Sequence, residues 1–102
     1  MGNVTFKFKL GLMQSKSIKS PLEVVIDGNE IIKIEPGASV AASVADGSHS
    51  LRLYINVVEG HGDQGRMGII NTAFDVKPGK NYLLTYEYAS MGQKGSVSVK
   101  EL

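Results

Sequence analysis

The chain has 102 residues, of which 42% are hydrophobic, so we expect a single domain over residues 1–102 with a core that needs no disulfide. The absence of cysteine excludes disulfides and thiolate metal sites, and the hydrophobic content together with a 21% charged fraction excludes a disordered polymer. A net charge of +1 provides no field that would attract nucleic acid.

Membrane and targeting signals are weak in this sequence. No apolar run approaches the roughly 20 residues that a spanning helix needs. The alternating start, Met1–Leu10, lacks the continuous apolar region of a signal peptide. We therefore expect a soluble segment that does not insert into a membrane, either complete or one piece of a longer chain. The composition assigns it to no compartment.

The first third of the chain predicts a strand and a hairpin. Residues 4–10 alternate apolar side chains with Thr and Lys, which is typical of a half-buried strand. Residues 22–34 favour a hairpin with a three-residue loop, 27–29, in which Asn29 supplies the left-handed position. This register opposes Val24 to Ile32, Leu22 to Ile34, Glu23 to Lys33 and, on the opposite face, Val25 to Ile31. A two-residue loop would lose the Glu23–Lys33 pair.

A second hairpin is predicted around the turn Asp46-Gly47. After a turn at residues 35–37, the chain alternates from Val40 to Val44 and then again from His49 onward. A two-residue loop at Asp46-Gly47 would pair Val44 with His49, Ala42 with Leu51 and Val40 with Leu53. In the following strand the inward positions are Leu51, Leu53, Ile55 and Val57, and the outward positions are Arg52, Tyr54 and Asn56.

The remaining strands complete an all-β pattern. The next strand has the inward set Ile70, Thr72, Phe74 and Val76, the strand after it carries Tyr82, Leu84, Tyr86 and Tyr88 on one face, and a short final strand contains Val97 and Val99. No helical period persists anywhere along the chain. Short strands about 8–12 residues apart, with turn residues between them, predict an antiparallel, immunoglobulin-like β-sandwich of about seven to eight strands, with a barrel as the alternative.

The loop after the long strand carries two candidate ligand sites. Residues 60–65 read G-x-G-x-x-G, but phosphate-binding loops of that kind precede a helix, whereas a strand is predicted to follow here. A hairpin loop is therefore the favoured interpretation. Glu59, His61 and Asp63 alternate within it and offer a divalent metal one imidazole and two carboxylates, against the alternative of a solvated loop.

The histidine and tyrosine side chains are candidates for catalytic and stacking roles. His49 lies between Ser48 and Ser50, but neighbours on a strand point to opposite faces, so His49 is expected to cap the core beside the Asp46-Gly47 turn. The tyrosines at 82, 86 and 88 could form a stacking platform, although a core position with hydroxyls at the rim is favoured. Tyr54 is the better candidate for an exposed aromatic side chain.

The turn motifs resemble those of the PEGA domain family and related small immunoglobulin-like bacterial modules. The motifs are Val25-Ile26-Asp27-Gly28, then Asp46-Gly47-Ser48-His49-Ser50-Leu51, then Val76-Lys77-Pro78-Gly79. Residues 20–23, Ser-Pro-Leu-Glu, stand where the tetrapeptide that names the family would lie. The resemblance implies a non-catalytic β-sandwich within a larger protein of the bacterial surface or envelope.

The function expected from these observations is that of a non-enzymatic module for interaction or spacing. It would need no cofactor and would contact a protein partner or a neighbouring domain through Val25, Ile31 and Tyr54. The alternative is a module that binds a glycan or a metal through residues 59–65 and nearby tyrosine side chains.

Overall fold

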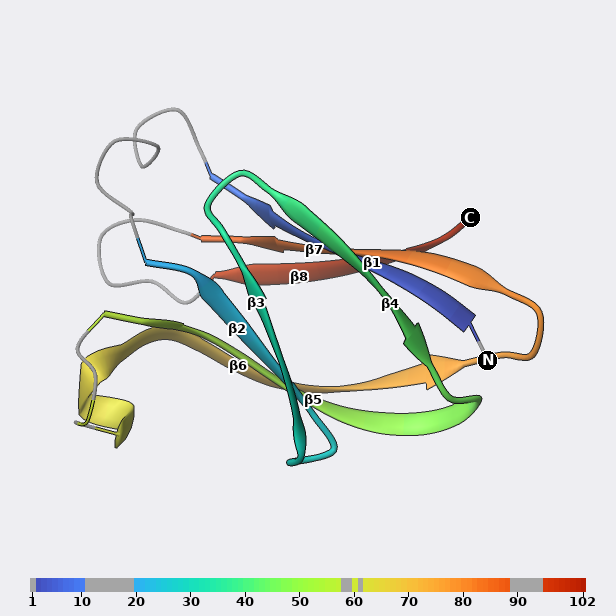
Figure 1. Cartoon of the computed structure of the whole chain (residues 1–102), viewed down its shortest axis with the longest axis horizontal. Helices are drawn as coiled ribbons and strands as arrows, with labels where there is room; N and C mark the ends of the chain where they lie inside the picture. Colours follow the sequence, from blue (N-terminus) through green and yellow to red (C-terminus); the bar gives the residue numbers. More distant parts are fainter. Residues whose placement is uncertain (1, 11–19, 58–59, 61, 89–94) are drawn as a thin grey trace.

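A computed structural model of the chain describes residues 2–10, 20–57, 60, 62–88 and 95–102, and these residues form two stacked four-stranded sheets (Figure 1). The predicted all-β sandwich is thereby confirmed. The strands are β1 (Gly2–Lys9), β2 (Leu22–Ile26), β3 (Glu30–Ile34), β4 (Ser39–Val44), β5 (Gly47–Asn56), β6 (Arg66–Val76), β7 (Asn81–Glu87) and β8 (Ser96–Glu101), and a 3-10 helix, η1 (Gly62–Gly65), precedes β6.

The strand order is β4-β1-β7-β8 in one sheet and β3-β2-β5-β6 in the other. Every neighbouring pair is antiparallel except β1 with β7, which run parallel and place Phe6 beside Leu84. The chain returns to the first sheet at the β3–β4 turn, where the backbone N–H of Gly37 donates to the carbonyl of Phe8 at 3.0 Å. Between β1 and β7 the chain passes twice through the other sheet, as β2–β3 and as β5–β6. A parallel pair needs a long connection of this kind because a tight hairpin can join only antiparallel strands.

The β2–β3 hairpin has the predicted three-residue register. Val24 lies opposite Ile32, Glu23 opposite Lys33 and Val25 opposite Ile31. The expectation for Asn29 is wrong, because the residues with positive φ are Asp27 (53°) and Gly28 (75°). Two such residues in a row make a type I′ turn, whose twist matches that of the flanking strands.

The predicted β4–β5 hairpin is wrong. β4 pairs with β1, so that Val40 lies opposite Phe6, whereas β5 pairs with β2 and β6, so that His49 lies opposite Phe74. Residues 45–47 form a corner that carries the chain from one sheet to the other, with Gly47 at φ 112°. Both arrangements keep the same side chains inward, so alternation alone could not distinguish a hairpin from a change of sheet.

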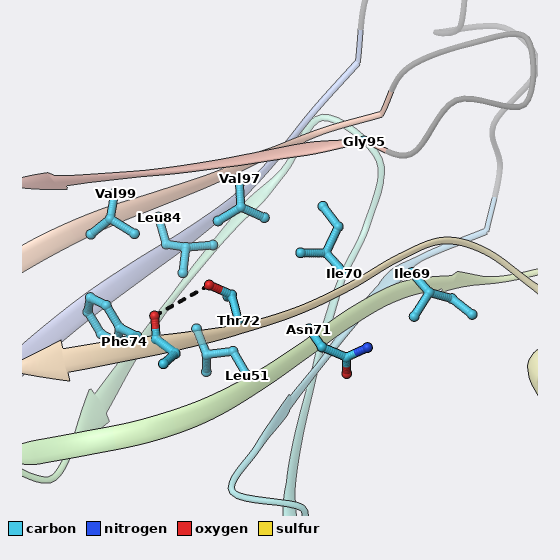
Figure 2. A pocket seen from close by; sticks show the side chains of 11 residues that line it. Leu51, Ile69, Ile70, Asn71, Thr72, Phe74, Leu84, Gly95, Val97 and Val99 are labelled. Carbon is cyan, nitrogen blue, oxygen red and sulfur yellow. Dashed lines mark hydrogen bonds between the residues drawn. The ribbon is translucent and has the colours of Figure 1, made fainter.

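The core fills the space between the sheets. Its fully buried members come from both layers and include the inward positions predicted for β1, β2, β5 and β7, namely Val4, Phe6, Phe8, Leu22, Val24, Leu53, Ile55, Leu84 and Tyr86. Two predicted inward positions differ. Val57 lies just beyond β5 and is 48% exposed. Thr72 points between the sheets but is exposed, because the sandwich is open along that edge (Figure 2).

Two tyrosines on β7 tie the sheets together through their hydroxyl groups. The hydroxyl of Tyr82 accepts the backbone N–H of Lys77 at 3.0 Å, across the turn between β6 and β7. The hydroxyl of Tyr86 donates to the carbonyl of Gly68 on β6 at 2.8 Å. Both rings are buried, which confirms the core role favoured for this strand. No helix within the described ranges is long and apolar enough to cross a membrane.

Candidate functional site

The three predicted contact residues lie on or beside one surface, the outer face of the β3-β2-β5-β6 sheet. We call Val25, Ile31, Arg52, Tyr54 and Arg66 the outer-face patch. Val25 and Tyr54 line a hollow of about 420 Å³ together with Arg52 and Arg66. Ile31 lies opposite Val25 in the β2–β3 ladder and is 55% exposed, so it extends the apolar surface beyond the hollow.

Tyr54 is buried rather than exposed, which corrects the expectation for this side chain. Only 3% of its surface is accessible, although it faces outward as its parity predicts. Two guanidinium groups cover the ring, with the Cζ of Arg66 at 4.1 Å and that of Arg52 at 5.8 Å from its centroid. An aromatic face attracts cations, so the arginines stack on Tyr54 and remove it from solvent.

A β-bulge explains how Arg66 reaches this face. The β5–β6 ladder shifts by one residue between the pairs Leu53–Ile70 and Ile55–Met67, and Gly68 in that interval has a φ of 63°. A shift by one residue transfers all later side chains to the opposite face. Arg66 therefore projects outward beside Tyr54, whereas the unbroken alternation of β6 would have turned it inward.

The electrostatics of the hollow combine two cations with one carboxylate. Glu23 is a buried charged residue, and it accepts the hydroxyl of Tyr54 at 3.3 Å. Burial raises the pKa of Tyr54 above its ordinary value, and the negative charge of Glu23 raises it further, against a lowering by Arg66. The phenol is therefore neutral at physiological pH and serves as a donor.

The polar cluster around His49 lies near one end of the sandwich. Its Nδ1 is 2.6 Å from Oδ2 of Asp27, and its Nε2 is 2.6 Å from the carbonyl oxygen of Ala45. Asp27 also accepts the backbone N–H of Ser50 at 2.9 Å. Both partners of the ring are acceptors, so both hydrogen bonds form together only when the imidazole is protonated. Consistently, the hydrogen bonds that His49 donates to Asp27 and Ala45 raise the pKa of His49.

This geometry makes His49 a structural side chain. A general base needs a ring nitrogen with a free lone pair directed at the substrate, but Nε2 here is directed at a backbone carbonyl. Ser48 is hydrogen-bonded to Asp75 and is therefore engaged elsewhere. His49 ties the β2–β3 turn to the corner at Ala45, close to the predicted position beside the Asp46-Gly47 turn.

Two of the three predicted metal ligands lie outside the residues that the structure describes. Glu59 and His61 lie outside the described residues, and only the backbone of Asp63 is described, within η1. Among the side chains that the structure does describe, no group of three or more His, Asp or Glu could hold a metal ion. The segment that follows the glycine-rich loop is the strand β6, as predicted, so the loop does not lead into a helix.

A cleft opens between the sheets along β6 and β8, the strands at one edge of each sheet (Figure 2). Its volume is about 530 Å³, and its walls carry the side chains of Ile70, Leu84, Val97 and Val99. Figure 2 shows these side chains pointing toward one another from the two layers. The cleft was not foreseen, because strand patterns predict which side chains face inward but not whether the layers close over them.

Comparisons of the chain with models of protein families, with curated proteins and with solved structures found no match.

Proposed function

We propose that this chain is a non-catalytic β-sandwich module that contacts a protein partner or a neighbouring domain through the outer-face patch. The observation that most directly supports this proposal is the hollow on the outer face of the β3-β2-β5-β6 sheet, in which Tyr54 lies beneath Arg66 and beside Val25. Tyrosine and arginine side chains in well-packed pockets are the types that contribute most to binding at protein interfaces.

The arrangement of the patch supports a contact surface. Ile31, at 55% exposure, is an apolar side chain held on a rigid strand, and it adjoins Val25 on the same face. The guanidinium groups are already stacked on Tyr54, so little side-chain entropy is lost when a partner binds them. Such a surface combines an apolar anchor with oriented donors for a partner's carbonyl or carboxylate groups.

Kinship with PEGA-like, immunoglobulin-like modules of the bacterial surface or envelope is part of the proposal. The turn motifs that carry the resemblance coincide with a β-turn at residues 27–28, a corner at residues 45–47 and a turn at residues 77–80. The hydrogen bond between Tyr82 and the backbone of Lys77, five residues upstream, is the arrangement called a tyrosine corner, a hallmark of immunoglobulin-like sandwiches.

Site-specific photocrosslinking tests the proposed surface. A photoreactive amino acid replaces Ile31 in the protein expressed in its native cells, and a matched variant carries the same group at Lys7, an exposed position on the other sheet. We expect a discrete adduct from position 31 and none from position 7. With the identified partner purified, Ile31→Asp should weaken binding by about tenfold or more, and Lys7→Asp should not.

Two results would contradict the proposal. One is the same set of adducts from both positions, which would indicate random encounters. The other is a catalytic activity of the purified chain that His49→Ala abolishes. An NMR titration with divalent metals and glycans that shifts residues 59–65 would instead favour the ligand-binding alternative.

A further inference from the structure

The segment Ser96–Val99 of the edge strand β8 lacks the charged and proline residues that normally prevent edge strands from pairing. β8 pairs with β7 and ends its sheet, and Val99 at its centre is 46% exposed. Ser96 to Val99 contains no charge and no proline, and it alternates small polar with β-branched side chains. Exposed edges of this kind present unpaired backbone groups and readily accept another strand.

The ladder between β7 and β8 shows which backbone groups of β8 face outward. The N–H of Leu102 donates to the carbonyl of Asn81 at 2.8 Å, so these two residues form a hydrogen-bonded pair. Such pairs alternate along an antiparallel ladder. Ser98 therefore directs its N–H and C=O toward Thr85 of β7. Val97 and Val99, at the intervening positions, direct their N–H and C=O groups toward the outer edge of the sheet, where no other described strand pairs with β8.

The sequence of β8 is complementary to itself about Ser98. If two copies pair antiparallel around a two-fold axis at Ser98, Val97 of one copy lies opposite Val99 of the other. Both residues have free-edge N–H and C=O groups, so each such pair forms two hydrogen bonds. Ser96 then lies opposite Lys100, and no two like charges face each other. A register centred on Val99 would place Val97 opposite Glu101. A register centred on Lys100 would place Lys100 opposite Lys100 of the other copy.

We propose that β8 pairs with β8 of a second copy in this register and joins the two β4-β1-β7-β8 sheets into one continuous sheet. The valines of the second copy would continue the inner face of the sheet past β8 and cover the mouth of the cleft. Their neighbours there are Ile70 and Thr72, which face into the cleft from β6 (Figure 2). The net charge of +1 leaves little repulsion between copies.

This pairing uses the opposite sheet from the outer-face patch, so it does not rest on the proposed function. A second copy fits the edge better than an unrelated strand because the same short sequence supplies both apolar pairs and both sets of free backbone groups. The C2 symmetry of the contact also leaves no edge of β8 open for further addition.

Charge variants of Ser98 test the pairing directly. In the proposed register Ser98 lies opposite itself in a non-hydrogen-bonded pair, where side chains are closest. It is exposed on the outer face of the sheet, so its substitution leaves the fold intact. By sedimentation equilibrium we expect the wild-type chain to dimerise. Ser98→Lys and Ser98→Glu should each weaken the dimer by about tenfold or more, and mixing the two variants should restore it.

The matched control is Ser39→Lys, on the opposite edge of the same sheet, which should leave the dimer unchanged. A wild-type chain that stays monomeric up to millimolar concentration would overturn the proposal. So would a dimer that Ser39→Lys disrupts and Ser98→Lys does not.

Disulfide trapping fixes the register. The chain has no cysteine, and the Cα atoms of a non-hydrogen-bonded pair are about 4.5 Å apart, within the range that a disulfide spans. With oxidised glutathione, Ser98→Cys should form a covalent dimer, whereas Ser39→Cys should not. Equal yields from the two variants would contradict the pairing.

Discussion

At the scale of single residues, the pair Asp27 and His49 makes stability depend on pH. Asp27 occupies a left-handed position in the β2–β3 turn, and its carboxylate holds both the imidazole of His49 and the backbone N–H of Ser50. The hydrogen bond from His49 lowers the pKa of Asp27, and the hydrogen bond to Asp27 raises the pKa of His49. Each group therefore favours the charged form of the other.

The direction of the pH effect follows from these two pKa shifts. His49 has a folded pKa above its unfolded value of about 6.5, so its contribution is fully present below that value and is lost as the pH rises through the folded pKa. Asp27 has a lowered folded pKa, so its contribution is present above about 3.9 and is lost as the pH falls through the folded pKa. The pair stabilises most between these limits.

We predict that the difference in free energy of unfolding between the wild type and His49→Gln is largest near pH 5–6 and declines toward pH 9. Urea denaturation of both proteins at pH steps across this range measures the difference, and other titrating groups cancel. Asp27→Asn should remove most of the pH dependence. A difference that stays constant from pH 5 to pH 9 would show that folding does not shift the pKa of His49.

At the scale of secondary-structure elements, the bulge of β6 and the ring of Tyr86 form one unit. A side chain at Gly68 would overlap the hydroxyl of Tyr86, and Gly68 has a φ of 63° that non-glycine residues rarely adopt. Burial raises the pKa of Tyr86 to about 12, with a smaller effect from Tyr88, so the hydroxyl keeps its proton and donates to Gly68. Glycine is therefore required at position 68 for two reasons: the positive φ of the backbone and the close approach of the Tyr86 hydroxyl.

A double-mutant cycle tests this unit. Tyr86→Phe should cost about 1 kcal/mol through loss of the hydrogen bond to Gly68. Gly68→Ala should cost more than Gly37→Ala, whose φ of 80° is similar but whose surroundings are open. The double variant should cost less than the sum of the single changes, because the phenylalanine ring leaves space for the new methyl group. Additive costs in thermal or urea unfolding would contradict this coupling.

The elements also show where sequence reasoning succeeds. The β2–β3 register follows from the pairing of Glu23 with Lys33 and of Val24 with Ile32, because charge and burial select the same alignment. The predicted pairing of β4 with β5 was wrong. Ala42 and Leu51 face inward whether or not the two strands pair, so their inward positions could not show which strands are neighbours. Which strand lies beside which depends on contacts distant in the sequence, such as that of Phe6 with Leu84, and local alternation does not encode them.

The candidate site was only partly predictable for the same reason. The pairing and partial exposure of Val25 and Ile31 follow from the hairpin register. The burial of Tyr54 depends on Arg66, which reaches the outer face only through the bulge at Gly68. A glycine within a predicted strand is a known sign of a bulge, so Gly68 was the available signal.

At the scale of the whole molecule, both sheets share one core and should unfold together. Phe8 is fully buried and meets Tyr86 edge-to-face, with ring centroids 5.7 Å apart. Its strand β1 lies in the interior of its sheet, between β4 and β7. A loss of packing at this position therefore affects the contact between the layers as well as the sheet itself.

We predict that Phe8→Ala lowers the free energy of unfolding by about 3–5 kcal/mol, a large part of the total for a domain of this size. The neighbouring Lys7→Ala, exposed on the outer face, should change it by less than about 0.5 kcal/mol. Circular dichroism and tyrosine fluorescence should report coincident transitions in both variants. Separate transitions would mean that the two sheets unfold independently.

The central place of β1 has a consequence for the order in which the protein can assemble. β1 leaves the ribosome first, yet its two neighbours are β4 and β7, the fourth and seventh strands to be made. Until residues 81–87 emerge, the edge of β1 that pairs with β7 has no partner strand from the same domain. The β2–β3 and β5–β6 hairpins can form during synthesis, whereas the β4-β1-β7-β8 sheet must wait until β7 and β8 have been made.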